Sequence, residues 1–185
     1  QRPLIAMISR LVYQKGLSLI DFAKFDLMSQ PADFVFLGTG EHGFENMLIW
    51  VSNNSSNMRA WIDFKPELSE TIYKGADMFL MPSLFEPCGI SQMIAMKYGT
   101  PPIVRAVGGL DDTVISYPNE HANGFKFLTY DARSMVDEIK KAIWTYIDRR
   151  DEFNKIVHNA IKSKFTWQDS AIKYKLLYLD ALGRK

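Results

Sequence analysis

The sequence predicts an α/β protein built on a Rossmann-like parallel sheet flanked by helices, with a helical C-terminal segment. Two observations predict this class: short apolar runs recur along the chain, and segments with helical spacing separate them. Strands that alternate with helices form parallel sheets, because each helix carries the chain back across one face of the sheet. The composition agrees with an ordinary globular domain, since 47% of the 185 residues are hydrophobic and 23% are charged.

Five apolar runs are each short enough to be a buried strand. They lie at residues 4–8, 34–37, 60–62, 78–81 and 101–104, and residues 123–127 are expected to add one more short strand. Segments with helical spacing follow each of the first four runs. The first of these helices carries Leu17, Ile20 and Phe22 on the face that should be buried.

The C-terminal part is expected to be helical throughout. From Asp131 onward, apolar residues at helical spacing mark one long amphipathic helix, namely Met135, Ile139, Ile143 and Ile147. We expect a sheet-based domain at residues 1–165 and a separate last helix at residues 166–185. The opening Gln-Arg-Pro leads at once into an apolar run, which is expected of a start inside a longer protein.

Charge and metal-ligand content exclude several functions. Lysine and arginine number 22 against 21 acidic residues, a net charge of +1, so no overall field attracts nucleic acid or an anionic membrane. The single cysteine, Cys88, forms no internal disulfide, which favours a reducing compartment. His42, His121 and His158 are too scattered to predict a metal site. No apolar run approaches the roughly 20 residues of a membrane-spanning helix.

Two cations follow the first predicted strand, at the edge of the sheet where ligands of parallel sheets bind. Loops at the carboxyl ends of such strands face helix N-termini and their unpaired N–H groups. Arg10 and Lys15 lie in the first of these loops, and fixed cations there suit a diphosphate. The alternative interpretation is a pair of solvated surface charges.

The fourth loop combines a carboxylate with a glycine at a helix start. Gly89, with Ser91 in the first helical turn, would let an anion approach the backbone N–H groups closely. Phosphate would repel Glu86, so this carboxylate is expected to accept hydrogen bonds from neutral sugar hydroxyls. Gly108 and Gly109 in the fifth loop add flexible backbone at the same edge. Together these loops predict a phosphorylated, hydroxyl-rich ligand.

The second loop contains a G-x-G-x-x-G motif at residues 38–43, and Asp63 ends the next strand. This spacing is typical of a dinucleotide site and predicts, taken alone, an NAD-dependent oxidoreductase. Two features count against it: the motif belongs to the second strand unit, and the helix after it meets the polar run 52–57. The alternative is a tight turn at Gly38 and Gly40 that lets any nucleotide approach the sheet edge.

Three segments carry a family resemblance: SRLVYQKG, the LGTG turn and, most specifically, PSLFEPCGISQMIAMKYGTPPIVRAVGGLDDTV. They resemble the C-terminal half of bacterial glycogen synthases and plant starch synthases, and the resemblance runs from about Pro3 to Trp167, Ala171 and Tyr174 in the last helix. It implies the donor-binding domain of a retaining glycosyltransferase of the two-domain GT-B architecture. Such enzymes transfer glucose, usually from ADP-glucose, to the nonreducing end of an α-1,4-glucan. The resemblance implies no resident cofactor and no metal.

The resemblance also implies roles for single residues. Arg10 and Lys15 would bind the donor phosphates, Glu86 would contact the sugar, and Phe64 would stack on adenine. Arg10, Lys15 and Glu86 are therefore the expected catalytic residues. The backbone at 88–91 would face the diphosphate. The expected donor-contacting residues are Gly38, Gly40, Phe64, Cys88, Gly89, Ile90, Ser91, Gly108 and Gly109.

The chain departs from the wider pattern in two ways. Many retaining GT-B enzymes have a second glutamate eight residues after the first, but here Ile94 occupies that position, as in the glycogen and starch synthase branch. The domain that would hold the acceptor glucan is absent, so residues 166–185 are expected to run back toward it, and the chain alone should be inactive. A noncatalytic glucan-binding module is the remaining alternative. The expected location is the cytoplasm, or the plastid stroma in a plant.

Overall fold

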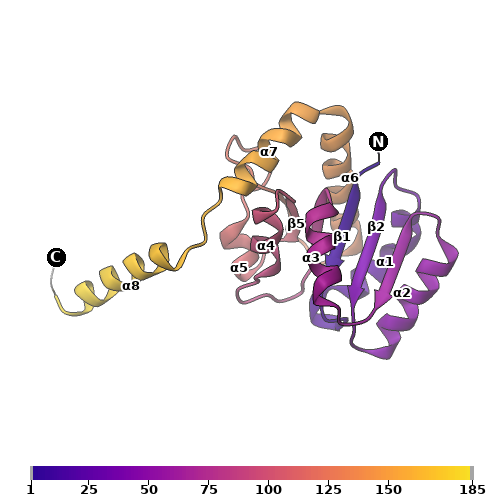
Figure 1. Ribbon diagram of the computed structural model, residues 1–185, viewed down its shortest axis with the longest axis horizontal. Coiled ribbons are helices and arrows are strands. Elements are labelled where there is room, and N and C mark those ends of the chain that lie inside the picture. The colour runs from indigo at the N-terminus through magenta and orange to yellow at the C-terminus, as the bar shows by residue number, and fades with distance from the viewer. Residues whose placement is uncertain (1, 184–185) are drawn as a thin grey trace.

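The computed structural model describes residues 2–183, apart from the side chain of Asp169. It contains a six-stranded sheet in the order β3-β2-β1-β4-β5-β6, in which all neighbouring strands are parallel (Figure 1). β2 and β3 are therefore added in order on one side of β1. The chain then crosses back, and β4, β5 and β6 are added in order on the other side of β1. This is the strand order of a Rossmann fold, so the predicted fold class is confirmed.

The described elements alternate between strand and helix up to β6. The strands are β1 (Leu4–Ile8), β2 (Asp33–Gly38), β3 (Met58–Ile62), β4 (Met78–Met81), β5 (Pro102–Arg105) and β6 (Phe125–Phe127). The helices are the 3₁₀ turn η1 (Tyr13–Lys15), α1 (Leu17–Met28), α2 (His42–Asn54), α3 (Pro66–Gly75), α4 (Ser91–Lys97), α5 (Gly108–Thr113), α6 (Ala132–Asp148), α7 (Arg150–Lys162) and α8 (Trp167–Ala181).

Four of the predicted strands differ from the observed ones by one or two residues at their ends. The third strand starts at Met58 rather than at residue 60, because β3 is an edge strand whose exposed Arg59 interrupts the apolar pattern. The long amphipathic helix predicted from Asp131 to Ile147 is confirmed as α6, and Arg149, with a ψ of 48°, separates it from α7. The short helix α5 was not predicted, because six residues are too few to show a helical period.

Successive residues of a strand point to opposite faces of the sheet, and both faces are covered. Phe34 and Phe36 of β2 pack in the core beneath α1, α2 and α6, whereas Val35 and Leu37 pack in the core beneath α3 and α4. Phe22 was expected in this core, but it is 79% exposed. The buried face of α1 is instead formed by Leu17, Leu19, Ile20, Ala23 and Leu27.

The last helix lies apart from the sheet. After residues 163–166, α8 projects away from the rest of the molecule (Figure 1). Large apolar side chains of this helix remain exposed, namely Trp167, Ile172, Tyr174, Leu176, Leu177 and Tyr178. The expectation that this helix runs toward a further domain stays a prediction. Within residues 2–183, no helix is both long and apolar enough to cross a membrane.

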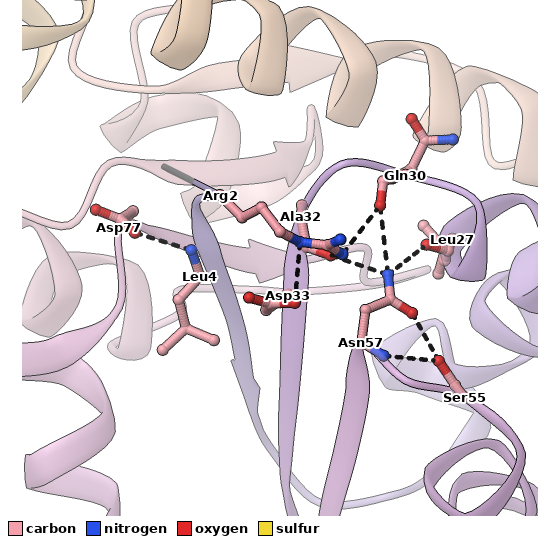
Figure 2. Close-up of polar contacts among 9 residues, drawn as sticks. All are labelled: Arg2, Leu4, Leu27, Gln30, Ala32, Asp33, Ser55, Asn57 and Asp77. Atoms are coloured by element: carbon pink, nitrogen blue, oxygen red, sulfur yellow. Dashed lines mark hydrogen bonds and ion pairs between the residues drawn. The ribbon is translucent and has the colours of Figure 1, made fainter.

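The amino ends of the strands are joined by a polar network (Figure 2). The buried side chain of Asn57 donates from Nδ2 to the carbonyl oxygens of Leu27, Gln30 and Ala32 at 3.3, 3.4 and 2.9 Å. Arg2 donates to the Ala32 carbonyl at 2.8 Å. These donors satisfy carbonyls where α1 ends and β2 begins, so the polar groups at this edge are used by the fold itself.

Candidate functional site

Two adjoining clefts lie at the carboxyl ends of the central strands. The first, of about 190 Å³, is lined by the ends of β1 and β4 together with Lys15. The second, of about 260 Å³, extends across the end of β2 to the loop after β3, where it reaches Phe64. Ile8, Ser9, Arg10 and Ser91 line both clefts. Because the strand order reverses between β1 and β4, this is the position at which open α/β sheets bind ligands.

Lys15 and Glu86 form an ion pair beside the first cleft. The distance from Lys15 Nζ to Glu86 Oε2 is 2.5 Å, and the two side chains are only 18% and 9% exposed. Ser83 Oγ donates to the same carboxylate oxygen at 3.3 Å. The sequence predicted separate roles for the two charged residues, whereas the structure brings them together. A buried carboxylate needs such a partner, because an unpaired charge is costly away from water.

The ion pair depends on a close approach between the loops after β1 and β4. Gly16 follows the turn that carries Lys15 and has a φ of +81°, and a Cβ atom there would lie 2.1 Å from the Pro82 carbonyl oxygen. The Leu84 N–H donates to the Gln14 carbonyl at 2.9 Å. Gln14 Nε2 in turn donates to the Phe85 carbonyl at 3.0 Å. The two loops are therefore held together by backbone contacts as well as by the ion pair.

The Arg10 side chain can bind a ligand at this edge of the sheet. It is exposed, and within residues 2–183 its guanidinium makes no hydrogen bond or ion pair. It lies where the two clefts meet. A guanidinium with free donors at the mouth of a cleft is suited to binding an anion such as a phosphate group.

The glycines of the G-x-G-x-x-G segment have a structural role. A Cβ atom on Gly38 would lie 1.9 Å from the Ser9 carbonyl oxygen, and one on Gly40 would lie 2.2 Å from that of Leu11. Gly43, by contrast, has nothing within 4 Å of its Cβ position. The third glycine of a dinucleotide fingerprint allows close packing of helix on strand, and here no such packing occurs.

Phe64 forms the outer wall of the second cleft. Its ring is 82% exposed, directly after the end of β3. The neighbouring Asp63 pairs with Lys65 Nζ at 3.1 Å. The hydrogen bonds from Lys65 and from the Phe64 N–H hold the pKa of the Asp63 carboxyl below its usual value. Asp63 is thus engaged locally, while the Phe64 ring is free to stack on a planar group.

The structure gives Gly108 and Gly109 a packing role, and their contacts with the donor stay a prediction. A Cβ atom on Gly108 would lie 2.2 Å from the Glu86 carbonyl oxygen, and one on Gly109 would lie 1.9 Å from that of Cys88. The Gly109 N–H also donates to the Glu86 carbonyl at 3.2 Å. These glycines let α5 approach the loop that carries Glu86.

Three further predicted residues, Ser91, Cys88 and Ile90, divide between two places. Ser91 lies in both clefts at the start of α4. Cys88 and Ile90 instead line another cleft, of about 480 Å³, against the segment that leads into α8. Among residues 2–183, no three His, Cys, Asp or Glu side chains come close enough to hold a metal ion.

Comparison with known proteins identifies the family. The model of the family "Glycosyl transferases group 1" matches residues 1–161. The chain belongs to this family of glycosyltransferases. It is 46% identical over 181 residues to the glycogen synthase of Clostridioides difficile strain 630, and 45% identical over 179 residues to that of Alkaliphilus metalliredigens strain QYMF. These alignments cover 96% and 95% of this chain but only 38% of each relative.

A solved structure agrees with this assignment. The catalytic domain of starch synthase IV from Arabidopsis thaliana, bound to ADP and acarbose, matches with a TM-score of 0.87 and 33% sequence identity. The match covers 99% of this chain and 39% of the starch synthase chain. The predicted GT-B relationship is therefore confirmed, and no comparison supports the alternative of an NAD-dependent oxidoreductase.

Sequence analysis of this family member missed two residues that support the site. Gln92 is fully buried, and its Nε2 donates to the Gly89 carbonyl at 3.0 Å and to Thr113 Oγ1 at 3.2 Å. Arg105, at the end of β5, donates from Nε to the Ser83 carbonyl at 2.8 Å. The only feature of the sequence that could have predicted a supporting role for Gln92 was its position as a polar side chain on an apolar helix face. Nothing in the spacing distinguished Arg105 from a surface cation.

Proposed function

We propose that this chain is the donor-binding domain of a glycogen or starch synthase, which transfers glucose from ADP-glucose to the nonreducing end of an α-1,4-glucan. Glycogen synthases and an ADP-bound starch synthase are among its relatives, which supports this choice of donor and product. The observation that carries the proposal is Arg10, whose guanidinium has no partner within residues 2–183 and which lies where two clefts meet at the switch point of the sheet.

The clefts suit the parts of a nucleotide sugar in one orientation. The exposed Phe64 ring would stack on adenine at the outer end of the second cleft. Arg10 and the backbone at the start of α4 would bind the diphosphate where the clefts meet. The glucose would then lie in the first cleft, beside Lys15 and Glu86.

The chemistry of this arrangement is stabilisation of a leaving group. The bond from the sugar C1 to the phosphate oxygen breaks, and its electron pair goes to ADP, whose negative charge Arg10 and Lys15 would stabilise. The acceptor hydroxyl would attack C1 from the same face and give its proton to the leaving phosphate oxygen, so the configuration is retained. In this proposal Glu86 acts without a second carboxylate, because Ile94 occupies the position eight residues later.

The acceptor glucan would be held mainly by the part of the longer protein that this chain does not include. The chain spans 38% of its curated relatives. Positioning of the acceptor supplies much of the rate in such transfers, and domain closure excludes water from the donor. We therefore expect this chain to bind nucleotide but not to elongate glycogen, and we expect the longer enzyme to work in the cytoplasm, or in the plastid stroma of a plant.

Calorimetry with four ligands tests the proposal. ADP should bind with a stoichiometry of about one to the folded chain, and UDP more weakly, while NADH and maltopentaose should give little or no heat. Tight NADH binding without a response to ADP would restore the oxidoreductase alternative. Binding of maltopentaose without any nucleotide would instead identify a glucan-binding module. Incubation with labelled ADP-glucose and glycogen tests the expected lack of elongation.

A further inference from the structure

We propose that Arg105 is a positioning residue for the Lys15–Glu86 pair. It would hold the loop that carries Glu86 so that the carboxylate stays on Lys15. Arg105 lines neither of the two clefts at the switch point, so its effect on a ligand passes through other residues. The binding part of this inference rests on the function proposed above, whereas its structural part does not.

The first support is the way Arg105 engages the loop after β4. Its Nε donates to the Ser83 carbonyl at 2.8 Å, and its Nη2 donates to the carbonyl of the next residue, Leu84. A planar guanidinium that bonds two consecutive carbonyls fixes the orientation of the two peptide groups to which they belong. Glu86 follows only two residues later, so the position of its side chain depends on this fork.

The second support is the ring behind the guanidinium. The Arg105 guanidinium carbon lies 5.5 Å from the centroid of the Tyr130 ring. The same ring makes an edge contact with Tyr13, at 6.5 Å between centroids, and its hydroxyl lies 3.0 Å from Ser18 Oγ. Tyr13 belongs to the turn that ends at Lys15. Arg105 and Tyr130 therefore connect the loop of Glu86 to the loop of Lys15 through contacts other than the ion pair.

Together these contacts connect Arg105 to both Lys15 and Glu86. Arg105 holds the Leu84 carbonyl, and the Leu84 N–H donates to the Gln14 carbonyl at 2.9 Å, one residue before Lys15. The 2.5 Å ion pair between Lys15 and Glu86 is the remaining link. Loss of the fork would let the loop after β4 move, and the carboxylate would then no longer be held on Lys15.

A mutant cycle separates positioning from simple stability. ADP affinity is measured for Glu86→Gln in the wild-type background and in an Arg105→Lys background, which keeps the charge but lacks the planar fork of the guanidinium. In the wild-type background, loss of the nearby negative charge should tighten ADP binding by about threefold to tenfold. In the Arg105→Lys background the same substitution should change affinity by less than about twofold, because the carboxylate is already displaced.

Arg59→Lys is the matched control at the opposite edge of the sheet. Arg59 Nη1 donates to the carbonyls of Ser55 and Met58, both at 2.7 Å, so this variant also removes guanidinium bonds to backbone. The effect of Glu86→Gln on ADP affinity should be unchanged in the Arg59→Lys background. An effect of Glu86→Gln that is equally large in the Arg105→Lys background would overturn the proposal.

Hydrogen exchange gives a second measurement that needs no nucleotide. In Arg105→Lys the amide of Leu84 should exchange at least about tenfold faster than in Arg59→Lys, because the loop opens locally. Unchanged exchange would overturn the positioning role even if ADP does not bind. If Arg105→Lys does not fold, Tyr130→Leu removes the supporting ring instead, with Tyr130→Phe as its control. Faster Leu84 exchange in Tyr130→Leu alone would support the proposal, and equal rates in both would contradict it.

Discussion

The two edges of the sheet differ in how far their exposed and polar side chains are engaged by the chain itself. At the amino edge, Asn57 and Arg2 donate to backbone carbonyls of the chain itself (Figure 2). At the carboxyl edge, Arg10 makes no such contact within residues 2–183, and Phe64 is 82% exposed. The helix ends explain the difference: helices end at the amino edge with carbonyls that need donors, and begin at the carboxyl edge with N–H groups that suit anions.

This difference separates stability from binding in the same domain. Substitutions at the amino edge should lower the free energy of unfolding and leave ligand affinity unchanged. Substitutions of Arg10 or Phe64 should weaken ligand binding and leave the free energy of unfolding unchanged. The Lys15–Glu86 pair lies between these cases, because it is mostly buried and its Lys15 also lines the first cleft. Each experiment below tests one side of this comparison.

The largest effect on stability is expected at Asn57. Asn57→Ala removes the donor of three carbonyls in a buried setting and should lower the free energy of unfolding by about 2–4 kcal/mol. ADP affinity should not change. Urea denaturation and calorimetry measure the two quantities. Asn54→Ala is the control, because that exposed side chain donates only to the Trp50 carbonyl, and an equal loss of stability in both variants would contradict the comparison.

The largest effect on binding is expected at Arg10. Arg10→Ala should weaken ADP binding by about 1.5–3 kcal/mol, the range of a hydrogen bond to a charged group. It should also make ADP binding less sensitive to salt, while the free energy of unfolding stays the same. Arg133→Ala serves as control, since its side chain is 92% exposed and lies on α6. Unchanged ADP affinity in Arg10→Ala would place the diphosphate elsewhere.

Phe64→Ala should affect binding to a similar or smaller extent. Loss of one stacked base typically costs about 1–3 kcal/mol, so ADP and ADP-glucose should be weakened alike. Phe64→Tyr should keep most of the affinity, because the ring is retained. Phe22→Ala is the matched control, since Phe22 is also exposed, at 79%, but lies on α1 away from the clefts. Equal losses in both alanine variants would argue against stacking at Phe64.

The sequence predicted the fold class and the parallel sheet correctly, because the buried strands are continuous apolar runs. It also predicted Arg10 at the ligand edge, because Arg10 follows β1 almost directly. It did not predict that Lys15 pairs with Glu86, since the two residues are 71 positions apart and meet only through the approach of two loops. That approach depends on Gly16 against Pro82, which no local pattern reveals.

The glycines show a second limit of sequence analysis. A glycine allows close approach of either a ligand or another segment of backbone, and the sequence does not distinguish these cases. Gly38, Gly40, Gly108 and Gly109 were predicted to contact the donor. In the structure each of them lies against a backbone carbonyl of a neighbouring loop. The donor contacts of these glycines stay a prediction, whereas the predicted burial of Phe22 was wrong, because the period of α1 places it on the side opposite the buried face.

The smallest effect is expected at Asp131, a carboxyl-edge residue that serves the fold. It caps α6, accepting from the Ser134 N–H at 2.9 Å and from Ser134 Oγ at 2.6 Å. The hydrogen bonds from the Ser134 side chain and N–H hold the pKa of the Asp131 carboxyl below its usual value. A lowered pKa in the folded state adds stability above the unfolded value, about 3.9, and this stability is lost as the pH falls through the folded pKa.

Asp131→Asn should therefore be less stable than the wild type at neutral pH, and the difference should shrink as the pH falls below about 4. Asparagine is itself a good N-cap, so this variant isolates the contribution of the charge, whereas Asp131→Ala also loses the cap and should remain destabilised at every pH. Urea midpoints between pH 3 and pH 7 would measure both effects, with the pH range set around the usual pKa of about 3.9.

A difference between Asp131→Asn and the wild type that does not depend on pH would show that the carboxylate charge is not what stabilises the helix start. ADP affinity should be the same in both variants, because neither cleft at the switch point includes Asp131. A loss of ADP affinity here would mean that the carboxyl edge does not separate into folding and binding residues as Arg10 and Asp131 suggest.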